Sequence, residues 1–393
     1  MKKIAIVTAT RAEYGLLKPL IQLVATDPEL ELQLLVTGAH LSHNHGNTWQ
    51  HIQKDGFHIS KKIEILLATD GPTAVSKAMG LAQLAFAEAF EELQPDLIVI
   101  LGDRYEMLAI ASTALIFNLP IAHLHGGELT YGAIDDSIRH AITKMSHLHF
   151  VATESYRQRV IQMGEAPNTV FNVGAIGLDS IKHLNLLNRQ ELEKQLGTSL
   201  QKQNIIVTQH PETKSKSPVQ EQISNLLQAL DDLEDTLLVF TGANADAQGT
   251  AINTALKNYA DQNPHKAIFR NSLGQLNYLS CLKHFDMVVG NSSSGIIEAP
   301  SFKIPVVNIG DRQLGRLMSP NIIHCSSQKT AISQAIQQAS HPGFKAKIQQ
   351  ITSPYGDGQA APQILQIIKH HKTAAIKTFF DISSLNLGNV SNA

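Results

Sequence analysis

Acidic and basic side chains in the first half of the sequence stand directly after short apolar runs. Asp103 and Arg104 follow the run DLIVIL, and His123, His125 and Glu128 belong to HLHGGE, which ends a second run. A carboxylate beside a guanidinium suits either acid–base chemistry or a structural ion pair. The two histidines lie on one side of an extended chain, and the glycines let a ligand approach the backbone. A metal pair is the less favoured interpretation, because no third ligand is obvious.

A second acidic group follows in the same half. Asp135 and Asp136 open a predicted helix, and Arg139 and His140 come one turn later. Acids at a helix start can serve as caps. Capping would account for one of the two acids, but not for both beside an arginine and a histidine. The pattern therefore adds Asp135 to the candidate acid–base residues.

The second half of the sequence carries groups that suit a phosphate. The sequence GNSSSG at 290–295 stands between a predicted strand and a helix start, so its N–H and hydroxyl groups could cradle a phosphate, with Glu298 near ribose hydroxyls. The alternative is a plain capped helix start. His210, Asn244 and Arg312 follow other predicted strands, and Arg312 supplies a cation.

Arg11 is the first basic side chain that follows a predicted strand. It stands in TATRAEYG at 8–15, interpreted as a loop before a helix at 16–25. An arginine there could bind a phosphate, or could form a cap or an ion pair. Neither G-x-G-x-x-G nor a P-loop occurs in the sequence.

These residues need a scaffold that brings strand ends together. Strands are predicted at 4–7, 32–36, 96–101, 120–124, 149–152 and 170–173, with helices at 105–117, 135–145 and 154–163 between them. After a polar stretch, strands follow at 205–208, 237–240, 267–270, 285–289 and 305–309. The alternation predicts doubly wound parallel sheets, which bind ligands beyond the carboxyl ends of their strands. We expect an α/β fold of two Rossmann-like domains facing across a cleft, at 1–180 and 181–365, then a helix end and tail at 366–393.

The composition limits the classes of function. The 393 residues include 32 basic and 34 acidic side chains, a net charge of −2, so no strong field attracts nucleic acid. Two cysteines do not build a disulfide scaffold, and they favour a reduced, cytoplasmic compartment. No apolar run approaches the length of a membrane span, and the run at 4–7 is too short for a signal peptide. We therefore expect no membrane partner.

Five histidines stand at irregular spacing near the end of the first domain's second predicted strand. They are His40, His43, His45, His51 and His58. We interpret them as surface histidines rather than as a metal site or a pH switch.

Eight ordered strings together resemble the UDP-N-acetylglucosamine 2-epimerase family, and specifically its hydrolysing branch. They are TATRAEYG (8–15), GDRYE (102–106), HLHGGE (123–128), DDSIRHAITK (135–144), QHPET (209–213), ANAD (243–246), GNSSSGIIE (290–298) and GDRQ (310–313). The resemblance covers residues 4 to about 371. It implies the glycosyltransferase-B arrangement, a C-terminal helix at 362–371 that crosses back to the first domain, and a homodimer or homotetramer.

The resemblance also implies roles for the residues above. Eight would hold the UDP part of a substrate: Arg11, Arg104, His210, Asn244, Ser292, Ser293, Glu298 and Arg312. Asp103, Asp135 and His210 would line the reacting sugar. Many relatives have Glu where this chain has His125, so we expect Glu128 to supply the acid at that level and His125 to contact substrate.

The activity that this predicts converts UDP-N-acetylglucosamine and water to N-acetylmannosamine and UDP, for sialic-acid-type sugar synthesis. As the C1–O bond to UDP breaks, positive charge builds at C1 and makes the C2 proton more acidic. A carboxylate removes this proton in an anti elimination. Water then adds to the 2-acetamidoglucal. Asp103 and Asp135 would be acid and base in either order, with His210 stabilising the diphosphate or relaying a proton. This chemistry requires no metal and no redox cofactor.

Two other functions stay open. The first is the same reaction on UDP-2,4-diacetamido-2,4,6-trideoxyglucose, on a route to legionaminic acid. The second is a glycosyltransferase-B-type sugar transferase, or an inactive binder of sugar nucleotides. A transferase would pass the sugar to an acceptor without exchange at C2, and an inactive binder would hold UDP but release nothing.

Overall fold

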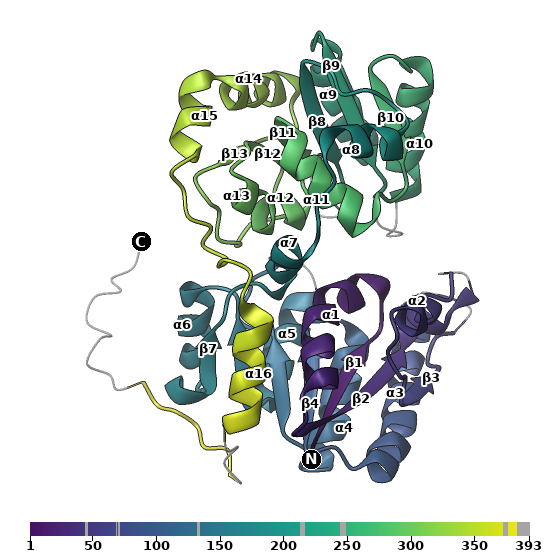
Figure 1. Ribbon diagram of the computed structural model, residues 1–393, viewed down its shortest axis with the longest axis vertical. Helices are drawn as coiled ribbons and strands as arrows, with labels where there is room; N and C mark the ends of the chain where they lie inside the picture. The colour runs from purple at the N-terminus through teal and green to yellow at the C-terminus, as the bar shows by residue number, and fades with distance from the viewer. Residues whose placement is uncertain are drawn as a thin grey trace. The chain divides into compact units, whose positions relative to one another are not determined.

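The computed structural model describes residues 1–43, 46–67, 69, 71–131, 134–212, 217–243, 249–371 and 376–382. It divides into two compact units (Figure 1). Unit 1 comprises Met1–Glu128, Ala133–Asp179 and Gly358–Ala393, and unit 2 comprises Leu129–Gly132 and Ser180–Asp357. Within the described ranges, no helix has both the length and the apolar character that crossing a lipid bilayer needs.

Unit 1 is a parallel sheet covered by helices on both faces. Its strands are β1 (Lys2–Thr8), β2 (Leu30–Thr37), β3 (Lys61–Ile63), β4 (Leu97–Leu101), β5 (Ile121–Leu124), β6 (Leu148–Val151) and β7 (Val170–Asn172). They run in the order β3-β2-β1-β4-β5-β6-β7, all parallel. Its helices are α1 (Arg11–Thr26), α2 (Trp49–Lys54), α3 (Pro72–Leu93), α4 (Tyr105–Ile116), α5 (Ile134–Met145), α6 (Glu154–Gln162) and α16 (Ala360–His370). Short 3₁₀ helices are η1 (Gly38–Leu41), η3 (Pro167–Thr169) and η4 (Ile176–Leu178).

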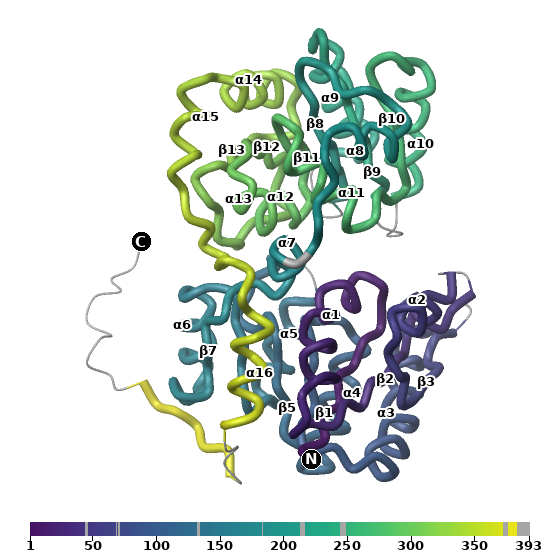
Figure 2. The backbone as a smooth tube through the Cα atoms, in the orientation of Figure 1, coloured from purple at the N-terminus to yellow at the C-terminus, as the bar shows by residue number. Residues whose placement is uncertain are grey.

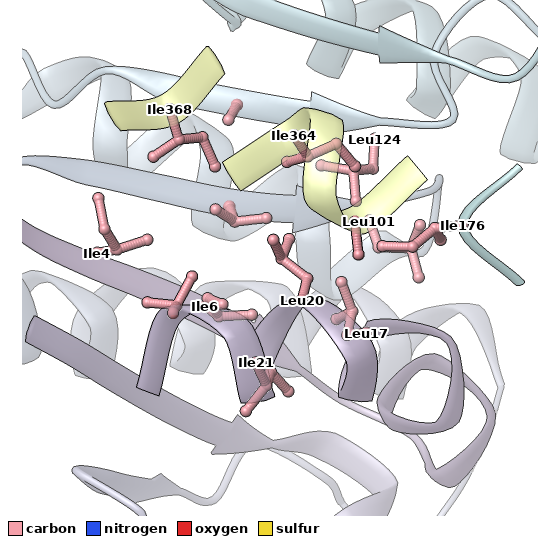
Figure 3. Packing of buried hydrophobic residues seen from close by; sticks show 14 of the residues in the cluster. Ile4, Ile6, Leu17, Leu20, Ile21, Leu101, Leu124, Ile176, Ile364 and Ile368 are labelled. Atoms are coloured by element: carbon pink, nitrogen blue, oxygen red, sulfur yellow. The ribbon is translucent and has the colours of Figure 1, made fainter. Parts of the chain in front are cut away.

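The two faces of this sheet have separate cores. Alternate residues of a strand point to opposite faces. Ile4 and Ile6 of β1 pack with α1 and α16, and Figure 3 shows the side chains of this cluster. Ala5 and Val7 belong instead to the cluster formed with α3 and α4. Both faces are therefore buried, as the nearly continuous apolar strands require.

Helix α16 belongs to unit 1 although the chain reaches it only after unit 2. Figure 2 shows it beside α1, and residues of both helices share one core. The buried Asp179 carboxylate caps its start, accepting from Ala360 N at 3.0 Å and Ala361 N at 2.6 Å. At its other end, Lys369 Nζ lies 2.8 Å from Asp27 Oδ2. These contacts place residues 358–365 with unit 1, whereas the domain boundaries predicted from the sequence put them in the second domain.

Unit 2 repeats the architecture with its own core. Its strands are β8 (Gln203–Thr208), β9 (Thr236–Thr241), β10 (Ala267–Arg270), β11 (Met287–Gly290), β12 (Val306–Ile309) and β13 (Ile322–Cys325), in the parallel order β10-β9-β8-β11-β12-β13. Its helices are α8 (Arg189–Leu196), α9 (Val219–Asp231), α10 (Gly249–Gln262), α11 (Gly274–His284), α12 (Ser293–Ile297), α13 (Ala299–Phe302), α14 (Lys329–Ser340) and α15 (Pro342–Ile348), and α7 (Asp179–His183) stands at the boundary of the units. Ile205 packs with α9, α10 and α14, and Ile206 packs with α8 and α11.

Two expectations about local structure are wrong. The segment 8–15, expected as a loop, is mostly helix, because α1 begins at Arg11. The reason is a capping box: Thr10 Oγ1 accepts from Glu13 N, and the Glu13 carboxylate accepts from Thr10 N at 3.1 Å. His40, expected on the surface, is fully buried between Thr8 and Thr48 hydroxyls. Burial lowers the pKa of His40 to about 4. His43, His51 and His58 are exposed as expected, and His45 lies outside the described residues.

A buried carboxylate ties the segment 376–382 to unit 1. Glu165 is 1% exposed and contacts Lys144 Nζ at 2.6 Å, His149 Nε2 at 2.9 Å and Lys377 Nζ at 2.8 Å. Burial alone would raise the pKa of Glu165, but these hydrogen bonds and charges lower it to about 2.

The depressed pKa of Glu165 predicts acid sensitivity. A carboxyl with a lowered folded pKa contributes stability above its unfolded pKa of 4.5, and this stability is lost as the pH falls towards about 2. We expect the free energy of unfolding to fall over this range, and E165Q to flatten that fall while lowering stability at pH 7. Urea unfolding at several pH values measures both. E88Q, on the exposed side of α3, should keep the wild-type pH dependence; equal slopes for E165Q and wild type would contradict the assignment.

Candidate active site

A buried arginine organises the acidic residues of unit 1. The Arg139 side chain on α5 is 3% exposed and is ion-paired to Asp103, two residues after the end of β4. Its Nη1 donates to the backbone oxygen of Glu128 at 2.7 Å and lies 3.5 Å from Asp136 Oδ1. A guanidinium can hold several acceptors in fixed directions. Arg139 therefore links α5 to the loops that follow β4 and β5.

The HLHGGE segment ends β5 at Leu124 and then makes a tight turn. His125 adopts a left-handed φ of 64°, which is uncommon for a residue other than glycine. Its Nδ1 lies 2.7 Å from Glu128 Oε1. Gly127 has a φ of 76°, and a Cβ there would lie 2.6 Å from the backbone oxygen of Tyr156. The glycine is therefore needed for the turn that brings Glu128 back to His125.

His123 has a structural role in the same segment. It is fully buried, its Nε2 donates to the backbone oxygen of Gly102 at 2.7 Å, and its Nδ1 lies 3.2 Å from Thr143 Oγ1. Burial lowers the pKa of His123 to about 3, so the ring is neutral. Among the described residues, no group of three or more His, Cys, Asp or Glu side chains could hold a metal ion.

Arg104 is engaged by two carboxylates of its own unit. Its Nη2 lies 2.9 Å from Glu106 Oε1, and its Nε lies 3.8 Å from Glu13 Oε1. Burial raises the pKa of Glu13 to about 7, and the Arg104 charge partly offsets that rise. The Arg104 side chain is nevertheless 41% exposed, so a further anion can still reach it. Arg11 is exposed at the first position of α1.

In unit 2, Asn291 ties the loop after β8 to the loop after β11. Asn291 Oδ1 accepts from His210 N at 2.7 Å, and Asn291 Nδ2 donates to His210 O at 2.9 Å. The Asn291 backbone oxygen accepts from Arg312 Nη1 at 3.2 Å and from Gln313 Nε2 at 2.8 Å. Burial, and then the Arg312 charge, lower the pKa of His210 to about 4. The His210 ring is therefore neutral near pH 7, with Arg312 held nearby.

The serine-rich loop after β11 starts a short helix. Ser292 caps α12, accepting from Ser294 N at 3.3 Å. The Ser294 hydroxyl donates to the Glu298 carboxylate and is 2.6 Å from the Tyr278 hydroxyl. Burial raises the pKa of Glu298. Ser293 is the first residue of α12.

Gly290 sets the path of the chain into that loop. It pairs with Thr208 in the sheet, has a φ of 129°, and a Cβ there would overlap the Thr208 carbonyl group. We expect G290A to lower the free energy of unfolding by about 2–4 kcal/mol, because overpacking and backbone strain each cost about 1–3 kcal/mol. Urea unfolding tests this. G15A on α1, where a Cβ meets nothing within 4 Å, should instead be neutral or stabilising; equal effects would contradict the account.

The structure brings together some of the residues predicted from the sequence. In unit 1, Asp103 and Glu128 meet through Arg139, and Asp135 lies beside Asp136 at the start of α5. In unit 2, His210 and Arg312 meet at Asn291. Asn244 lies outside the described residues. Arg139, Glu106 and Gln313 belong to these networks, and none of them had an assigned role in the sequence.

The chain matches known proteins over most of its length. A family model described as UDP-N-acetylglucosamine 2-epimerase matches residues 22–369. A Campylobacter jejuni protein named GDP/UDP-N,N'-diacetylbacillosamine 2-epimerase (hydrolyzing) is 50% identical over 88% of this chain and 89% of its own. The chain belongs to the UDP-N-acetylglucosamine 2-epimerase family, in its hydrolysing branch. A Legionella pneumophila relative, UDP-N,N'-diacetylbacillosamine 2-epimerase (hydrolyzing), is 38% identical over 94% of this chain and 96% of its own. The resemblance inferred from the eight strings is therefore confirmed.

Solved structures of the same family share the fold. A putative UDP-N-acetylglucosamine 2-epimerase from Listeria monocytogenes matches with a TM-score of 0.80 at 18% identity, covering 97% of this chain and 99% of that one. The Neisseria meningitidis UDP-GlcNAc 2-epimerase, solved bound to UDP-GlcNAc, matches with a TM-score of 0.81 at 16% identity, covering 94% and 100%. The predicted fold class, α/β with two Rossmann-like domains of the glycosyltransferase-B type, is confirmed.

Proposed function

We propose that this family member is a hydrolysing 2-epimerase whose substrate is UDP-2,4-diacetamido-2,4,6-trideoxyglucose, that is, UDP-N,N'-diacetylbacillosamine. It would release UDP and the free 2-epimer, 2,4-diacetamido-2,4,6-trideoxymannose. The observation that carries this choice is the 50% identity to the Campylobacter jejuni relative named for that sugar. The sequence alone put UDP-N-acetylglucosamine first.

UDP-N-acetylglucosamine is the second candidate substrate. A Neisseria meningitidis relative named UDP-N-acetylglucosamine 2-epimerase is 31% identical over 98% of this chain. The C2 chemistry is the same for both sugars, because both carry an acetamido group at C2. They differ at C4 and C6, so the catalytic residues proposed below serve either one.

The first chemical step is an elimination. The C1–O bond breaks with its electron pair leaving on UDP, and a carboxylate removes the C2 proton to form the glucal double bond. Asp103 and Asp135 supply the carboxylates for the proton transfers at C2. Asp103 is positioned by its ion pair with the buried Arg139.

The diphosphate needs donors that stabilise the negative charge as the bond breaks. Arg312, Arg104 and Arg11 supply cations, and Ser292 and Ser293 supply hydroxyl and backbone donors. Burial lowers the pKa of His210 to about 4, so its neutral ring would act as a hydrogen-bond donor rather than as a cation. Glu298 and Asn244 complete the set proposed for the nucleotide.

A substrate comparison tests the proposal. The purified protein is supplied in turn with UDP-2,4-diacetamido-2,4,6-trideoxyglucose, its GDP analogue and UDP-N-acetylglucosamine, and kcat/KM is measured from release of nucleoside diphosphate and free sugar. We expect the first substrate to exceed UDP-N-acetylglucosamine at least about tenfold, which corresponds to about 1.4 kcal/mol of discrimination. The reverse ratio would select the second candidate. Sugar transfer to an acceptor, without release of free sugar, would contradict both.

A further inference from the structure

The hydrolytic half of the proposed reaction needs a base that the elimination does not. In hydration, the double-bond electrons form the new C2–H bond with a proton from an acid, and the water oxygen bonds to C1 and loses a proton. Inversion at C2 takes the proton from one face and returns it to the other, which occupies two acid–base groups. Asp103 and Asp135 fill those two roles in the proposed function. The proton of the attacking water still needs an acceptor.

His125 has the geometry of an oriented base. A carboxylate oxygen only accepts, so the 2.7 Å contact from Nδ1 to Glu128 Oε1 places the ring hydrogen on Nδ1 and leaves a lone pair on Nε2. The Nε2 atom is buried and has no hydrogen-bond partner among the described residues. The Glu128 side chain is only 4% exposed. A buried carboxylate that orients an imidazole can also stabilise the imidazolium formed when Nε2 takes a proton.

His123 shows what a structural histidine looks like in the same segment. Both of its ring nitrogens have partners, Gly102 O at 2.7 Å and Thr143 Oγ1 at 3.2 Å. Within the part of the chain that the structure describes, His125, two residues later, has a partner for Nδ1 alone, and it holds a strained left-handed backbone with a φ of 64°. Strain of this kind is maintained where the surroundings over-determine the conformation, which is common at functional sites.

The surroundings do hold this turn. Arg139 Nη1 donates to the Glu128 backbone oxygen at 2.7 Å, while its Nη2 pairs with Asp103. One buried guanidinium therefore contacts both a proposed C2 acid–base group and the backbone of the residue whose carboxylate orients His125. The water base and the C2 group would then belong to one connected network within unit 1.

We infer that His125 is a further catalytic residue, which accepts through Nε2 the proton of the water that adds to C1, with Glu128 as its positioning residue. This inference rests on the proposed function. The C1–O bond to water forms as the water O–H bond breaks, the proton passes to Nε2, and the imidazolium returns it to solvent after the free sugar leaves.

The variant H125N separates the two half-reactions. Asparagine tolerates the left-handed backbone and keeps an N–H for Glu128, but it lacks Nε2. With the substrate that wild type prefers, we expect UDP release to stay within about tenfold of wild type, while free sugar falls by about 10²-fold or more and the glucal accumulates. Equal loss of UDP release and free sugar, or no loss of either, would overturn the inference. H58N, which changes an exposed histidine, is the control and should match wild type in both measurements.

Glu128 and chemical rescue give two further tests. E128Q should slow hydration, and the double variant H125N/E128Q should be no slower than H125N, because Glu128 acts only through His125. Additive losses would contradict that role. Adding imidazole to H125G, where glycine accepts the backbone conformation, should restore free-sugar formation, and absence of rescue would count against the water-base role. If wild type releases neither UDP nor free sugar from any substrate, the proposed function fails; a normal H125N beside an active wild type overturns only this inference.

Discussion

Replacing Asp103 or Asp135 by asparagine is expected to lower turnover by a factor of about 10²–10⁴, the usual contribution of a positioned acid or base. Asparagine keeps the size of the side chain but cannot take or return the C2 proton. Because the nucleotide is assigned to other residues, the dissociation constant for UDP should change little. Steady-state kinetics and calorimetric titration with UDP measure the two quantities separately.

A matched control lies at the other end of the same strand. Asp96 directly precedes β4, at the amino end of the strand, whereas Asp103 follows its carboxyl end. The Asp96 carboxylate accepts a hydrogen bond from Lys3 N at 2.7 Å. D96N makes the same chemical change away from the carboxyl ends of the strands, and we expect turnover near that of wild type. Turnover near wild type in both D103N and D135N would remove these residues from the mechanism.

Replacing Arg139 by methionine is expected to lower the free energy of unfolding by about 1–3 kcal/mol, because it removes a buried guanidinium from the Glu128 backbone oxygen and from two carboxylates that are 27% and 25% exposed. The change strips contacts from Asp103, Asp136 and the Glu128 backbone oxygen. Turnover should fall as well, since the proposed proton-transfer network depends on this guanidinium. Urea unfolding followed by circular dichroism measures the stability.

The comparison for Arg139 is an exposed arginine with an ordinary helix ion pair. The Arg189 side chain is 57% exposed and lies 3.2 Å from Glu193 Oε1 one turn later. Exposed pairs contribute about 0–1 kcal/mol, so R189M should unfold almost as wild type does. If R139M and R189M lose similar amounts of stability, Arg139 does not organise unit 1 in the way its contacts indicate.

The order of strands and helices was largely visible in the sequence, because strands buried on both faces are continuous apolar runs. The prediction missed β3 and β13, which end the two sheets. Edge strands are less buried, and β3 begins with Lys61 and Lys62, so the apolar signal is absent. The start of α1 was missed although Thr10 and Glu13 form a recognisable capping pair, because the arginine between them drew the interpretation towards a phosphate loop.

The sequence indicated which residue types belong to the candidate site, but it did not predict the contacts between them. The sequence placed Asp103, His125 and Glu128 after the ends of predicted strands. The carboxyl ends of parallel strands lie along the same edge of a sheet, so these residues were expected near one another. It did not indicate that Arg139 is buried, because a helical arginine one turn after two acids more often stands on a solvated face. It also did not indicate the left-handed turn at His125, which depends on the close approach of Gly127 to the backbone oxygen of Tyr156.

The central claim is that C2 is deprotonated during loss of UDP and that water then captures the glucal. Proton NMR of the reaction in D₂O tests it most directly, with the substrate that wild type prefers. The account predicts UDP and a free 2-epimerised sugar that carries deuterium at C2. A free sugar that retains protium at C2, or a UDP-linked epimer as the stable product, would contradict it.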